Sequence, residues 1–169
     1  MSDTALVVLF VLAVALHNLE EGLWLPHFAA RLWRAPSAAN FRFGVIVLTV
    51  LIALVAAWCV AGGRNSLPAY LLAGTVLAML ANIIVPHLLG TLILRRYVPG
   101  LATSIALIAP TGALLLDRLV SAGWVEPRTL LWSAPLVVAA IVGLIAALFA
   151  LGARLFPLRG KTTASPPAR

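Results

Sequence analysis

The sequence predicts an all-α fold, a multi-pass transmembrane helical bundle of about five spans. Hydrophobic residues make up 63% of the 169-residue chain, whereas charged residues make up only 10%. A soluble domain usually has about a quarter of its residues charged, so this composition cannot build a surface that faces water. The second observation is that long apolar runs alternate with short charged segments, as expected of helices that cross a bilayer.

The charged residues place the individual spans. A span needs about 20 apolar residues, and the spacing of the charges predicts helices at about residues 4–25, 43–63, 67–94, 100–117 and 129–153, within one domain of residues 1–156. The first apolar run, from Thr4 to Leu19, is too short to cross alone. It reaches the required length only if the helix continues through Glu20 and Glu21. This length argument therefore predicts two carboxylates inside the membrane.

The basic residues predict the orientation. Two loops and the C-terminal segment carry nine of the twelve Lys and Arg residues: Arg31, Arg34, Arg42, Arg95, Arg96, Arg154, Arg159, Lys161 and Arg169. Cytoplasmic loops are enriched in basic residues, so we expect these three segments inside and the N-terminus outside. The C-terminus, with a Ser-, Thr- and Pro-rich tail at residues 157–169, is then expected to be cytoplasmic and disordered.

The net charge of +7 does not indicate nucleic-acid binding. The basic residues are dispersed singly and in pairs between apolar runs, so they cannot form one basic face. The expected partner is the lipid bilayer, with a lipid-like substrate as a further candidate and no nucleic acid. The expected location is the cell membrane, in particular the bacterial inner membrane.

A polar cluster interrupts the first apolar segment. On a helical wheel His17, Glu20, Glu21 and Trp24 share one arc of about 100°, so one imidazole and two carboxylates project in the same direction. An ionised side chain at mid-membrane costs about 2.5–3.5 kcal/mol, so these groups need partners inside the bundle. A buried proton-sharing cluster, or an early helix end with interfacial carboxylates, would also accommodate them.

The third expected helix can supply those partners. Asn82 and His87 lie at a depth comparable to that of His17, but they point about 140° apart in an ideal helix. Pro86 cannot donate a hydrogen bond to the carbonyl of Asn82 and is expected to kink the helix. Both side chains can reach one site only because of that kink. A structural hydrogen bond between helices is the alternative role for His87, and it is the favoured role for Asn82.

Two imidazoles with one or two carboxylates form a suitable site for Zn²⁺ or Fe(II). We expect His17, His87 and either Glu20 or Glu21 to bind the metal, with the remaining glutamate acting as a general base. Both glutamates are therefore candidate metal ligands and candidate catalytic groups, and Asn82 and Trp24 are candidate supporting residues. His27 follows Pro26 near the cytoplasmic end and is expected to be solvated.

Three motifs occur in order along the chain: His17-Asn18-Leu19-Glu20-Glu21, then His87, then Tyr97-Val98-Pro99-Gly100. This set resembles the bacterial HXXEE-motif membrane proteins, over roughly Leu9 to Pro110. The resemblance implies that His17, Glu20, Glu21 and His87 are signature residues. The family has no established function and is suspected to contain enzymes, so the resemblance names no substrate.

The leading hypothesis is a metal-dependent membrane enzyme that acts on a lipid or other apolar substrate, with a His/Glu site between the first and third helices. The alternative is a small proton- or cation-coupled transporter or a ligand-binding membrane module. A third hypothesis is an accessory subunit whose polar groups lock the helices together. Transporters typically show internal repeats or broken helices around their site; repeats are not evident, and Pro86 is the hint of a break.

Overall fold

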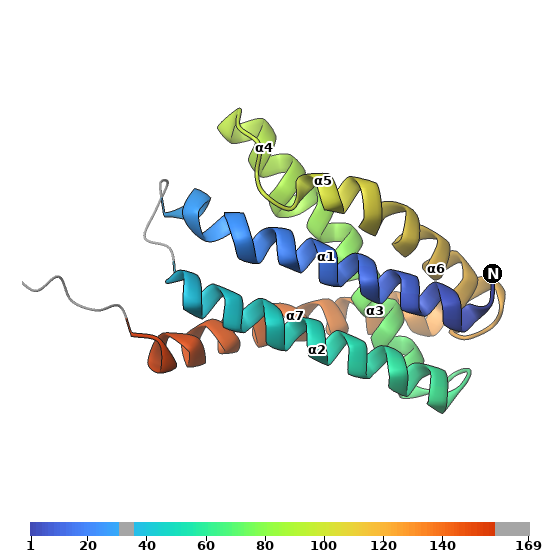
Figure 1. Cartoon of the computed structure of the whole chain (residues 1–169). Coiled ribbons are helices and arrows are strands. Elements are labelled where there is room, and N and C mark those ends of the chain that lie inside the picture. Colours follow the sequence, from blue (N-terminus) through green and yellow to red (C-terminus); the bar gives the residue numbers. More distant parts are fainter. Residues whose placement is uncertain (31–35, 158–169) are drawn as a thin grey trace, which may run out of the picture.

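The described part of the chain, residues 1–30 and 36–157 of a computed structural model, folds into helices and contains no strand (Figure 1). Five helical segments are long and apolar enough to cross a membrane, which confirms the predicted fold class. The first, second and fifth segments are α1 (Asp3–Ala29), α2 (Ala38–Gly62) and α7 (Pro127–Leu155). The third segment is made of α3 (Leu67–Asn82), η1 (Ile83–Leu88) and α4 (Leu89–Leu94). The fourth segment is made of α5 (Leu101–Thr103), η2 (Ser104–Ile108) and α6 (Ala109–Ser121).

The expected tail, residues 157–169, lies outside the described residues apart from Pro157, as do Arg31 and Arg34 of the first loop. Which side of a membrane each terminus occupies stays a prediction.

α1 continues past both glutamates, so the alternative of an early helix end does not apply. Its first turn is capped by the Ser2 hydroxyl, which accepts a hydrogen bond from the backbone N–H of Ala5 at 3.1 Å. The helix runs through Pro26 to Ala29, farther than the expected end near residue 25. Pro26 has no N–H, so the carbonyl of Gly22 lacks its helical partner. The Nε–H of Arg42 in α2 donates to that oxygen instead, at 3.0 Å.

α2 begins at Ala38, earlier than the expected start near residue 43. The Ser37 hydroxyl caps it by accepting from the backbone N–H of Asn40 at 3.2 Å. Arg42 therefore lies within the helix and not in the loop. Its long side chain reaches toward α1, which lets a charged residue occupy the first turns of an otherwise apolar helix.

The third segment is broken in its second half. Val85 has φ −128° and ψ 119°, which is extended and not helical backbone. Steric clash with the following proline ring pushes a residue out of the α conformation and into this region, so Pro86 accounts for the break. The predicted kink is therefore present, and it lies between Asn82 and His87.

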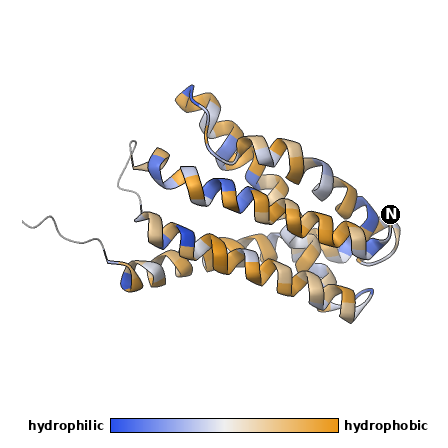
Figure 2. Cartoon of the chain, viewed as in Figure 1, coloured by the Kyte–Doolittle hydropathy of each residue, from blue (hydrophilic) through white to orange (hydrophobic). Residues whose placement is uncertain are grey.

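The helices enclose an apolar core in the half of the bundle near the N-terminus. α1 packs closely on α2 and on the fourth segment, whereas α3 packs on α2, α6 and α7. Fully buried side chains in this core include Phe10, Val14, Leu72, Val76, Ile108 and Leu115. Most of the exterior is hydrophobic as well, and the hydrophilic residues of α1 concentrate in its second half (Figure 2). α1 and the third segment meet there through long side chains.

Candidate metal centre

His17 and Glu21 of α1 meet His87 of η1 inside the bundle. One ligand atom from each residue lies within 4.8 Å of the other two. Glu21 Oε1 is 3.1 Å from His87 Nε2 and 3.6 Å from His17 Nε2. Both imidazoles are fully buried, and the Glu21 side chain is 13% exposed. The structure thus brings together three of the four predicted ligands, and we call these three residues the His–Glu–His cluster.

Local geometry explains why they converge. His17 and Glu21 are four residues apart on an unbroken helix, so they occupy the same face. His87 reaches them from the far side of the break at Val85. The two imidazole rings are perpendicular, with centroids 5.1 Å apart.

Asn82 joins the cluster from the near side of the same break. Its amide nitrogen lies 3.3 Å from His17 Nε2 and 3.0 Å from His87 Nε2. An amide NH₂ group has two hydrogens and can donate one to each imidazole. Each Nε2 would then accept that hydrogen with its one lone pair, so the imidazoles could bind a cation through Nε2 only if the Asn82 amide turned away. Asn82 is therefore a member of the site, as the kink argument required.

A relay of hydrogen bonds sets the tautomer of His17. The Thr103 hydroxyl lies 2.5 Å from Glu20 Oε2 and 3.2 Å from the Gly100 carbonyl, so its single proton belongs to the closer, charged acceptor. The same oxygen lies 3.1 Å from His17 Nδ1 and accepts its proton. His17 is therefore protonated on Nδ1 and unprotonated on Nε2. Metal-binding histidines commonly have such a partner on the outer nitrogen.

Glu20 lies outside the His–Glu–His cluster. Its Oε1 accepts hydrogen bonds from the Gly100 N–H at 2.9 Å and from the Tyr97 hydroxyl. Its Oε2 accepts from the Thr103 N–H at 3.3 Å and from the Thr103 hydroxyl. Each oxygen thus has two donors, and the carboxylate binds the start of the fourth helical segment. A carboxylate with four donors is poorly placed to act as a general base.

The Tyr97–Gly100 motif wraps around Glu20. The Tyr97 hydroxyl also accepts from the N–H of Ala102 at 3.1 Å. Burial and the hydrogen bond to Glu20 raise the pKa of Tyr97, so the phenol keeps the proton that it donates. Gly100 has φ +100°, and a Cβ atom added there would overlap the His87 ring. The motif therefore supplies hydrogen bonds to Glu20 and, at Gly100, the space that the His87 ring occupies.

The structure also shows site residues that sequence reasoning missed, and it leaves one predicted residue outside. Thr103 and Ser104, whose hydroxyl lies 3.4 Å from His17 Nδ1, carry no motif beyond their place just after Gly100. Trp24 is 55% exposed and is not brought to the cluster. His27 is exposed, in agreement with the expected solvated position.

The His–Glu–His cluster borders a cavity of about 420 Å³ between α1, α2, the third segment and α7. Polar groups lie at one end, where His17, Glu21 and Asn82 contribute to the wall. Most of the remaining wall is apolar and includes Leu48, Ile52, Met79, Val138, Ile141 and Ile145. The cavity can therefore hold an apolar group with one end beside the cluster.

The residues fit a divalent cation. Zinc and iron sites have ligand distances of about 2.0–2.2 Å, which puts neighbouring donor atoms about 3–3.5 Å apart. The measured Glu21–histidine separations are close to that range. A cation that took the place of the Asn82 hydrogens would be bound by two Nε2 lone pairs and the Glu21 carboxylate. A proton shared between Glu21 and His87 would suit the same 3.1 Å contact.

Comparisons with known proteins agree with this reading of the motifs. Residues 8–115 match the model of a family described as "Protein of unknown function with HXXEE motif". The chain is also 30% identical to the "Uncharacterized protein YrkK" of Bacillus subtilis (strain 168), over 89% of this chain and 98% of that protein. No solved structure matches at a significant level. The chain belongs to the HXXEE-motif family, and two residues of that motif, His17 and Glu21, lie in the His–Glu–His cluster.

Proposed function

We propose that this chain is an integral membrane enzyme of the bacterial cell membrane that binds one divalent metal ion, Zn²⁺ or Fe(II), and acts on a lipid or other apolar substrate. The observation that carries the proposal is the meeting of three lone-pair donors at the polar end of an apolar cavity. Burying an ionisable group in an apolar surrounding costs free energy unless a partner compensates it. A bound divalent cation would supply that compensation for the Glu21 carboxylate.

His17, Glu21 and His87 are the proposed ligands. Thr103 and Glu20 act as positioning residues, because they hold His17 with its Nε2 lone pair facing the cluster. Asn82 lines the cavity, and its amide lies within hydrogen-bond distance of both Nε2 atoms; with a metal on those atoms, the freed amide N–H groups can orient a substrate carbonyl or a bound water. A bound metal would supply a Lewis acid, and in the case of iron also a centre for oxygen chemistry.

The assignment of Glu20 as general base is not supported by its four hydrogen bonds. Glu21 is the better candidate to touch the reacting group, since it is partly exposed and lines the cavity. If Glu21 is a ligand, a proton acceptor has to come from the substrate or from a metal-bound hydroxide.

Metal content tests the proposal directly. Protein purified without chelator should contain about one equivalent of Zn or Fe by elemental analysis. His17→Ala, Glu21→Gln and His87→Ala should each lose it, whereas the exposed control His27→Ala should retain it. A metal-free wild-type protein that also fails to take up Zn²⁺ or Fe²⁺ in titration would rule out the metal centre.

Membrane orientation is part of the same proposal. Fusions of a reporter after Arg34, Asn65, Tyr97 and Glu126 should report inside, outside, inside and outside in turn, because the basic segments are expected to be cytoplasmic. A fusion after Arg34 that reports the outer side would invert the scheme. The metal centre would then lie nearer the outer leaflet.

One observation favours a second function, a proton- or cation-coupled transporter. The third segment is broken at Val85, between two residues of the site, and broken helices are typical of transporter sites. In proteoliposomes a transporter should move protons or cations in a way that Glu21→Gln abolishes. An enzyme should give no such flux while still retaining its metal.

A further inference from the structure

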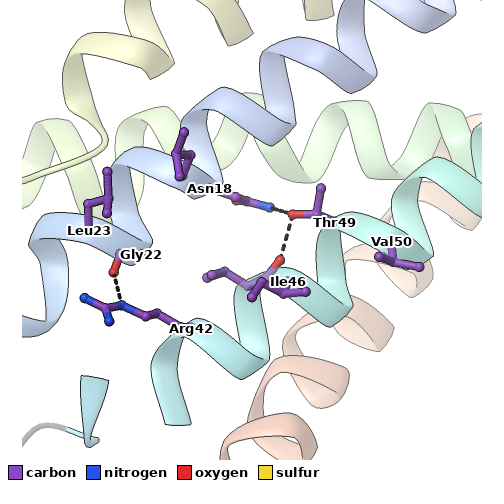
Figure 3. A pocket seen from close by; sticks show the side chains of 9 residues that line it. Asn18, Gly22, Leu23, Arg42, Ile46, Thr49 and Val50 are labelled. Carbon is purple, nitrogen blue, oxygen red and sulfur yellow. Dashed lines mark hydrogen bonds between the residues drawn. The ribbon is translucent and has the colours of Figure 1, made fainter. Parts of the chain in front are cut away.

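We propose that the groove between α1 and α2 binds an anionic phospholipid, with Arg42 holding its head group. Figure 3 shows the residues that line this groove, which has a volume of about 300 Å³. Its lining differs from that of the cavity beside the His–Glu–His cluster except for Asn18. Its apolar wall comes from both helices and includes Leu19, Leu23, Val45, Ile46 and Val50. Arg42 is the one charged residue that lines it.

The backbone of α1 fixes the place of Arg42. Because Pro26 leaves the Gly22 carbonyl without a helical donor, the Arg42 Nε–H donates to that oxygen at 3.0 Å (Figure 3). This bond holds the guanidinium group against α1 at the groove. Its terminal nitrogens form no hydrogen bond to the described residues, and no carboxylate of residues 1–30 or 36–157 lies within 4.0 Å of them. They are free to donate to an anion.

The other polar groups of the groove are already satisfied. Asn18 Nδ2 donates to Thr49 Oγ1 at 2.7 Å, and the Thr49 hydroxyl donates to the carbonyl of Val45 at 2.7 Å (Figure 3). Asn18 also lines the cavity beside the metal centre, so this pair forms part of the wall between the two spaces. What remains in the groove is an apolar surface next to one positive charge that pairs with no carboxylate of the described residues.

This combination matches a phospholipid better than a free anion. Arg42 is four residues into α2, so it lies about 6 Å from the end of that helix, at a depth where phosphates meet acyl chains. Ile46 and Val50 follow on the same face, one and two turns deeper, and are 62% and 52% exposed. An acyl chain can cover these side chains while the phosphate accepts hydrogen bonds from Arg42. The positive charge favours an anionic head group over a zwitterionic one.

The test is a measurement of lipid affinity by native mass spectrometry on the full-length protein in detergent, with phosphatidylglycerol and phosphatidylcholine as probes. The wild type should prefer phosphatidylglycerol by about five- to tenfold. Arg42→Gln should abolish that preference, whereas Arg95→Gln, which removes an exposed charge elsewhere, should preserve it. Ile46→Trp should weaken binding of both lipids by filling the groove, whereas Ile93→Trp, on an exposed face of α4, should not.

Three results would overturn the proposal. These are an Arg42→Gln variant that retains the preference, a wild type that binds the two lipids equally, and competition by inorganic phosphate as strong as that by the lipid, which would indicate a site for the free anion. If Arg42→Gln does not fold, the preference of the wild type is measured at about 1 M salt, where screening should remove it. Metal content should stay unchanged in all of these variants, which separates this inference from the metal proposal.

Discussion

Glu20 and Glu21 are consecutive residues of α1, yet they lie in opposite kinds of surroundings. Glu20 accepts four hydrogen bonds at the start of the fourth helical segment. Glu21 faces two buried imidazoles and an apolar cavity. The rotation of about 100° between neighbouring helical residues is enough to separate the two roles. One carboxylate joins segments of the protein, and its neighbour stays available for a ligand.

The difference lies in what compensates each charge. N–H and O–H donors stabilise the Glu20 carboxylate from within the fold, and they are present whether or not anything is bound. Glu21 has no such set of donors among the described residues, and the polar groups that it contacts are the two histidines. A cation or a proton must therefore neutralise it. The structure predicts that stability depends on Glu20, whereas ligand binding depends on Glu21.

The largest expected effect comes from exchanging each carboxylate for its neutral isostere. Glu20→Gln should lower the free energy of unfolding by about 2–4 kcal/mol, because an amide nitrogen would face donors that now reach an oxygen. Glu21→Gln should change the stability of the metal-free protein by less than about 1 kcal/mol and should abolish metal binding. Unfolding of the metal-free protein in mixed micelles gives the free energy of unfolding of both variants. Equal losses of stability would contradict the separation of roles.

The next largest effect is expected at Gly100, and Gly123 provides the comparison. Gly100→Ala should cost about 2–3 kcal/mol, because it combines backbone strain at φ +100° with overlap of the added methyl group and the His87 ring. Gly123→Ala is the matched control: φ is +69°, but no atom lies within 4 Å of the added Cβ. It should cost about 1 kcal/mol, from strain alone. Metal binding should weaken in the first variant only.

Hydropathy and length were sufficient to predict the fold, because five apolar segments of spanning length leave few other arrangements. The convergence of Asn82 and His87 could be predicted conditionally, since Pro86 identified the place of the break. The different surroundings of Glu20 and Glu21 could not be predicted from the sequence. A helical wheel gives the direction of each side chain on its own helix, but not which neighbouring segment lies opposite.

Thr103 and Arg42 show two further limits. The role of Thr103 depends on the fold of the turn that precedes it, and a single hydroxyl in an apolar segment carries no pattern. The rule that charges mark the ends of spans predicts a loop position for Arg42, but the residue lies within α2. α2 begins four residues before Arg42, and the carbonyl of Gly22 that Pro26 leaves free gives the Arg42 side chain a hydrogen-bond partner on α1.

A variant with a smaller expected loss of stability than Glu20→Gln or Gly100→Ala tests the link between the two carboxylate sites. Thr103→Val removes the hydroxyl that joins Glu20 to His17 Nδ1 while keeping the shape of the side chain. We expect a loss of about 1 kcal/mol in stability, since the backbone N–H donors to Glu20 remain. Metal affinity should fall by about 10- to 100-fold, because His17 loses the partner that fixes its tautomer.

Thr103→Ser is the control for that variant, because it restores the hydroxyl and should recover most of the affinity. Competition with a chelator of known affinity gives the measurement. A Thr103→Val protein with unchanged metal affinity would show that Glu20 and Glu21 act independently. The relay would then be a packing contact, and the His17 tautomer would be set by Asn82 and the metal alone.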